Sequence, residues 1–328
     1  MSKLILKLKD LKNAKKENKM IYFNLVAHKD IIDNHYEKLR IKLNNRIDSS
    51  SLNLQAKSFI TENLKLILEG EPAVIKDIDS RFKEIQTHTA RIKSKLSKIF
   101  DYIGFRTKSN NGDYDAYELA LMLGTRTCLY CNRNYTLTIS KGYRKTDKIT
   151  RPEFDHFFDQ SDYPLLALSI FNLIPSCKIC NSTLKHTKKF TLDNNLHPYK
   201  DDVIDFYKYS YVPHDVGSIL GGKSELSVKI NIVSDDKNLD KKIVNSKNIF
   251  KLEDIMSGHA EELKDILEIR HRFSSRYFEE LLKKYYLLGL NYEEIYRIVF
   301  GTYSLEKDFG KRPFSKLKKD LLKELGII

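Results

Sequence analysis

The chain has 328 residues, of which 41% are hydrophobic and 31% are charged. This composition supplies enough apolar material for a globular protein of two or three domains. The longest apolar stretch, residues 163–175, is shorter than the about 20 residues that a transmembrane helix needs, and the basic N-terminus lacks the apolar run of a signal peptide. The sequence therefore predicts a soluble, cytoplasmic protein with no membrane partner.

Positive charge is concentrated in the first two-thirds of the chain. Lys and Arg exceed Asp and Glu by 57 to 44, a net charge of +13. The net charge is +9 over residues 1–100 and zero over residues 201–328. A polyanion would be drawn to the first part. A lysine-rich coding bias would produce the same excess, so charge alone leaves nucleic-acid binding open.

We expect an α+β protein in three parts. Residues 1–112 carry apolar side chains at helical spacing and predict a basic helical region, which the serines at 49–51 and the Gly70–Pro72 step divide into about three helices. Residues 113–200 form the second part. Within it, an alternating segment at 135–139, a turn at Lys141–Gly142 and an extended piece ending in EFDH at 153–156 predict a hairpin.

Residues 201–328 form the third part. The segments 205–212 and 225–233 alternate as strands do, and the pattern becomes helical from Lys251 onward. The segment GSILGGKS, at 217–224, matches a phosphate-binding loop. That mechanism needs a helix directly after the loop, whereas a strand pattern follows here. We therefore predict a glycine-rich turn and no ATP site.

All four cysteines occur as two CxxC pairs, CLYC and CKIC. Such pairs in a reducing compartment are typical of a metal site, and four thiolates close the tetrahedral shell of one Zn²⁺. The sequence therefore predicts a structural, non-catalytic zinc bound by Cys128, Cys131, Cys177 and Cys180.

Asp155, His156, Asn172 and Asn181 follow in order between and just after the cysteine pairs. The Asp155 carboxylate is a hard oxygen ligand that suits Mg²⁺ or Mn²⁺, and the His156 imidazole can take a proton from attacking water. The amide oxygen of Asn181, directly after the last cysteine, can complete the metal site. Lysines at 178, 185, 188 and 189 lie close by in sequence and could contact phosphate.

The layout CxxC, DH, N and CxxCN followed by Lys resembles the HNH endonucleases, whose fold is called ββα-metal. The resemblance covers residues 127–190, with HPY at 197–199 as a candidate extension. It implies that His156 is the general base, that Asp155 and Asn181 bind the catalytic ion, and that Asn172 holds the loop carrying the base. Two further histidines, His186 and His197, are open candidates as metal ligands.

The chain is similar to a bacterial anti-phage defence subgroup, the Septu-type and retron-associated HNH proteins. The similarity lies in the segments TCLYCNRNY, RPEFDHFF and YPLLALSIFNLIPSCKICNSTLKH. The resemblance implies an effector nuclease, with DNA preferred over RNA and an ATPase as candidate partner. Two alternatives stay open: a zinc-stabilised nucleic-acid-binding module without catalysis, and an HNH ribonuclease acting on tRNA.

Overall fold

The computed structural model describes residues 23–107, 114–142, 147–219, 226–273 and 275–328. These residues form an α+β protein that is mostly helical, with three small sheets. No helix in these ranges is long and apolar enough to cross a bilayer. The basic stretch at the N-terminus, at 1–22, and residues 220–224 of the glycine-rich segment lie outside the described residues.

The first part of the chain is helical, as predicted, but it contains more helices than expected. The short 3₁₀ turn η1 (Leu25–Ala27) precedes α2 (Lys29–Ser49), α3 (Leu54–Glu69), α4 (Pro72–Ile85), α5 (Ala90–Ile99) and α6 (Tyr102–Thr107). The expected breaks at the serines and at Gly70 are confirmed. An unforeseen break follows Ile85. Helix α5 begins after Thr89, which caps its N-terminus because the Thr89 side chain accepts a hydrogen bond from Ile92 N.

Two short antiparallel sheets lie in the middle of the chain, after α7 (Ala116–Leu123). Strand β1 (Ile139–Ser140) pairs with β2 (Lys148–Thr150), and β3 (Glu153–His156) pairs with β4 (Leu173–Ser176). The predicted hairpin was therefore partly wrong: its extended second piece is divided, and the EFDH segment pairs with a strand downstream of it. A seven-residue π-helical segment, η5 (Ile179–Lys185), follows β4.

The third part begins with the predicted strands, β5 (Tyr207–Pro213) and β6 (Leu226–Ile232), which pair antiparallel. Between them the structure describes only the short helix α8 (Val216–Ile219). The helices that follow are α9 (Lys237–Ile249), α10 (Leu252–Ser257), α11 (Ala260–Arg272), α12 (Ser275–Leu287), α13 (Tyr292–Phe300) and, after the 3₁₀ segment η6 (Glu306–Lys311), α14 (Ser315–Glu324). The predicted change from strand to helix is confirmed, but it comes earlier than expected: α9 begins at Lys237, before the predicted boundary at Lys251.

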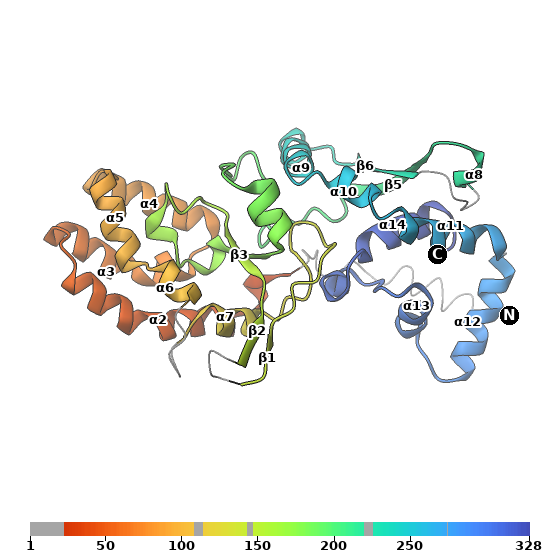
Figure 1. The fold of residues 1–328 in the computed structure, drawn as a ribbon, viewed down its shortest axis with the longest axis horizontal. Coiled ribbons are helices and arrows are strands. Elements are labelled where there is room, and N and C mark those ends of the chain that lie inside the picture. Colours follow the sequence, from red (N-terminus) through yellow and green to blue (C-terminus); the bar gives the residue numbers. More distant parts are fainter. Residues whose placement is uncertain (1–22, 108–113, 143–146, 220–225, 274) are drawn as a thin grey trace.

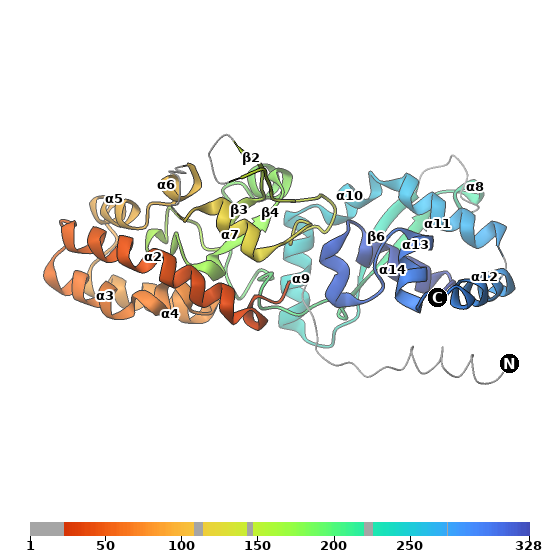
Figure 2. The ribbon, with the colours of Figure 1, turned by 90° about the horizontal axis from the view of Figure 1, so that it is seen from below.

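The molecule is elongated, with helices α2–α5 at one end and the C-terminal helices α11–α13 at the other (Figures 1 and 2). The middle segment, which carries β3 and β4, lies between them. Two contacts bind it to both neighbours. The His35 imidazole of α2 is hydrogen bonded through Nε2 to Leu168 O (2.8 Å), and Phe314 N donates to Asn132 O (2.8 Å). One apolar core cluster includes residues of all three parts.

Candidate metal and catalytic site

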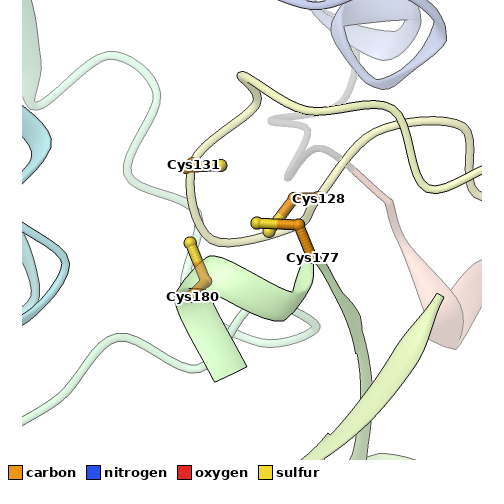
Figure 3. Close-up of side chains that lie close together, drawn as sticks. All are labelled: Cys128, Cys131, Cys177 and Cys180. Carbon is orange, nitrogen blue, oxygen red and sulfur yellow. The ribbon is translucent and has the colours of Figure 1, made fainter. Parts of the chain in front are cut away.

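The two CxxC pairs meet in space. All four cysteines are free of disulfides and buried, and their Sγ atoms lie within 4.8 Å of one another. Figure 3 shows Cys128 and Cys131 on one loop facing Cys177, at the end of β4, and Cys180, in η5. A tetrahedral Zn²⁺ places its sulfur ligands about 3.8 Å apart, which is within this range. The cluster can therefore hold a metal ion such as zinc.

His156 ends β3 and is oriented by two neighbours. Its Nε2 atom is hydrogen bonded to the carbonyl oxygen of Ala167 (2.9 Å), and the Tyr102 ring of α6 packs edge-on at 4.4 Å between ring centroids. Because a carbonyl only accepts, Nε2 carries the proton and Nδ1 is the basic nitrogen. Burial lowers the pKa of His156 below its ordinary 6.5, despite the opposing hydrogen bond. The imidazole is therefore neutral at pH 7, the form that accepts a proton.

Asn172 is fully buried and fastens the chain that follows His156. Its Oδ1 atom accepts from Phe158 N (2.7 Å), and its Nδ2 atom donates to Phe158 O (3.1 Å) and Leu166 O (3.0 Å). Phe157 N also donates to the Asn172 carbonyl (3.1 Å). These bonds join the chain that follows β3 to the segment before β4, so the Asn172 side chain fixes the backbone just after His156.

Asp155 lies next to His156 and is almost fully enclosed. Tyr130 donates its hydroxyl hydrogen to Oδ2 (2.5 Å), and Lys185 Nζ donates to Oδ1 (2.8 Å). The side chains of Asp155 and Lys185 are only 5% and 4% exposed. Lys185 also donates to His156 O (2.5 Å) and therefore bridges both residues of the DH pair. The expectation that Lys185 is a surface contact for phosphate was wrong, because its ammonium group is buried in this ion pair.

Asn181 lies on η5 against the same strand. Its Nδ2 atom donates to Glu153 Oε2 (2.9 Å), which also accepts from Ser182 Oγ (2.8 Å). Glu153 and Asp155 are two residues apart on β3, so both point to the same face, which meets η5. The hydrogen bond uses the amide nitrogen of Asn181 and not its oxygen, which is the atom that would bind a cation.

His186 and His197 have different surroundings. His186 is exposed, directly follows η5 and lines the same cleft as His156, so it stays a candidate ligand. His197 is fully buried, with Nε2 hydrogen bonded to Phe171 O (3.0 Å) and Nδ1 accepting from Tyr199 N (3.3 Å). Burial lowers the pKa of His197 to about 3. Since both ring nitrogens are used by the chain, we exclude His197 from the candidate ligands.

A cleft of about 680 Å³ brings the site residues together. Asp155, His156 and Asn181 line it, whereas Asn172 lies behind it in the core. Sequence reasoning missed part of its lining: Tyr102 and Arg106 from α6, Tyr117 from α7, Arg151 and Glu153. Only Glu153 had a sequence signal, since it is two residues before Asp155 in a strand pattern.

Arg151 lies in the wall of this cleft and forms no ion pair with a carboxylate of the described residues. Its guanidinium lies 5.5 Å from the centre of the Tyr117 ring and 5.8 Å from that of Phe154, and it donates to the backbone oxygens of Pro152 (2.6 Å) and Arg106 (3.4 Å). Its Nε atom is buried and has no hydrogen-bond partner in the described part of the chain. An arginine packed in this way keeps its charge and several donors for an anion.

The comparisons with known proteins assign no family. Neither the protein-family models, nor the curated proteins, nor the solved structures contain a match to this chain.

Proposed function

We propose that this protein is a metal-dependent endonuclease of the HNH type, which hydrolyses phosphodiester bonds in nucleic acid, with DNA preferred over RNA. The observation that carries the proposal is the state of His156. Its Nε2 proton is bound to the Ala167 carbonyl, burial keeps the ring neutral, and the residue lines a cleft that also contains arginines. A neutral, oriented imidazole beside an anion-binding wall is what a general base for phosphodiester hydrolysis requires.

The oxygen donors near His156 fit a hard divalent ion. A carboxylate has about four lone-pair positions, and hydrogen bonds from Tyr130 and Lys185 use two of those on Asp155. Asn181 adds an amide oxygen. Among the described residues, only the four cysteines bring three or more Cys, His, Asp or Glu ligands together. A second ion would therefore be held by few protein oxygens, with water and phosphate as further ligands, as Mg²⁺ prefers.

These contacts suggest a role for each residue of the proposed site. Asp155 and Asn181 would hold Mg²⁺ or Mn²⁺, which stabilises the charge that develops on the phosphate. His156 accepts the proton of the attacking water at Nδ1, while Ala167 O keeps the ring oriented. Arg106 and Arg151, which line the same cleft, would bind phosphate oxygens. The four cysteines would hold a structural zinc, because a complete thiolate shell leaves no open position for substrate.

The test compares wild type with His156→Ala in the presence of Mg²⁺ or Mn²⁺, on duplex DNA, single-stranded DNA and total RNA. Loss of the base lowers cleavage by about 10²–10⁴-fold, with substrate affinity unchanged. The matched control is His271→Ala, which changes an exposed histidine on α11 and should cleave like wild type. A His156→Ala protein that cuts as fast as its parent would refute the assignment.

One observation favours the alternative of a non-catalytic nucleic-acid-binding module. The Lys185 ammonium already neutralises Asp155, as it would where no ion is bound. This alternative expects binding without cleavage by the wild type under every metal condition. The HNH resemblance extends the proposal to a role in anti-phage defence with an ATPase partner, and the sequence motifs are its only support.

A further inference from the structure

The loop of the first cysteine pair reaches directly into the candidate catalytic site. Tyr130 lies between Leu129 and Cys131 in the CLYC segment, and its hydroxyl group donates to Asp155 Oδ2 at 2.5 Å. One residue of the loop that carries Cys128 and Cys131 therefore contacts the carboxylate proposed to bind the second ion.

Aromatic packing fixes the position of that hydroxyl group. The Tyr130 ring stacks on Phe250, with centroids 4.3 Å apart and planes at 25°, and meets Phe190 edge-on at 6.3 Å. Tyr130 itself is 8% exposed. Phe190 follows η5 in the chain and Phe250 directly follows α9. Because its ring packs against both of these residues, the Tyr130 side chain has little freedom. The donor is therefore presented to Asp155 in one orientation.

We propose that Tyr130 is a positioning residue that links the four-cysteine site to the second ion site by fixing the Asp155 carboxylate. Hydrogen bonds to a metal-binding carboxylate orient it, and removing such a partner typically weakens metal affinity by about 10–100-fold. This inference rests on the proposed ion site at Asp155. It adds that the cysteine site acts on ion binding through one hydroxyl group, in addition to stabilising the fold.

The test is the affinity for Mn²⁺, measured on zinc-loaded protein by electron paramagnetic resonance and calorimetry. Tyr130→Phe removes only the hydroxyl group and keeps the stacking on Phe250. It should retain full zinc content and bind Mn²⁺ about 10–100-fold more weakly than wild type. The matched control is Tyr199→Phe, which removes another buried tyrosine hydroxyl, bonded to Leu173 O at 2.9 Å, and should bind Mn²⁺ as wild type does.

The outcomes separate this inference from the proposed function. Unchanged Mn²⁺ affinity in Tyr130→Phe overturns the positioning role, even if the protein cleaves nucleic acid. Unchanged Mn²⁺ affinity in Asp155→Asn overturns the ion site and the inference together. A wild type that binds Mn²⁺ at Asp155 in a Tyr130-dependent way but cuts no substrate supports the inference and refutes the nuclease.

Discussion

Replacing Lys185 with methionine tests the most unusual contact of the site, a buried ion pair at the proposed metal ligand. Lys185 Nζ lies 2.8 Å from Asp155 Oδ1, and both side chains are at most 5% exposed. Methionine has a similar volume and no charge, so Lys185→Met leaves the Asp155 carboxylate buried without its cation. Breaking a buried pair in this way costs about 3–5 kcal/mol of unfolding free energy.

A divalent ion should offset part of that loss, because it can neutralise the same carboxylate. An ion that binds only the folded state at 100 times its dissociation constant stabilises it by about 2.7 kcal/mol. In the wild type, Lys185 competes with the ion for Asp155. The same Mg²⁺ concentration should therefore stabilise the wild type less than it stabilises Lys185→Met. Lys185→Met should therefore be much less stable than wild type in metal-free buffer. Added Mg²⁺ should reduce the difference in unfolding free energy between the two proteins.

The assay is urea unfolding of zinc-loaded protein, in buffer freed of divalent ions by ion exchange and then with Mg²⁺ added. The matched control is Lys316→Met, which breaks another buried pair, Lys316 Nζ to Asp320 Oδ2 at 2.8 Å, in α14. This control should be destabilised and gain no extra stability from Mg²⁺. The reasoning is refuted if Lys185→Met equals wild type in stability, or if Mg²⁺ stabilises it no more than Lys316→Met.

The remaining predictions concern pH, zinc and charge. Since burial lowers the pKa of His156, the fall of kcat/KM on acidification should have its midpoint below pH 6.5, and a midpoint above 6.5 would contradict this. Protein purified without added metal should contain one zinc per chain by elemental analysis, and Cys177→Ser should unfold the middle of the chain. Replacing Arg106 and Arg151 together with alanine should reduce the slope of log affinity against log salt by about two. Arg40→Ala, which breaks an exposed pair with Glu37 on α2, is its control and should leave that slope unchanged.

The sequence by itself determined the features that depend on local spacing. Two residues between cysteines define each half of the metal cluster, and neighbouring positions place Asp155 beside His156 at a strand end. The strands β5 and β6 and the C-terminal helices also followed from periodicity, because one buried face repeats every two residues in a strand and about every 3.6 in a helix. These signals lie within a few residues of one another and need no knowledge of the packing.

Only the tertiary structure decided which distant segments meet. It paired β3 with β4 rather than with the preceding strand, and it brought Arg106 from the N-terminal helices into the cleft. It also buried Lys185 against Asp155 and placed the Tyr130 hydroxyl on the same carboxylate. A lysine and a tyrosine are compatible with the surface as well as the interior. Whether these two side chains are buried or exposed depends on partners 25 to 30 residues away in the sequence, which only packing brings within hydrogen-bond distance.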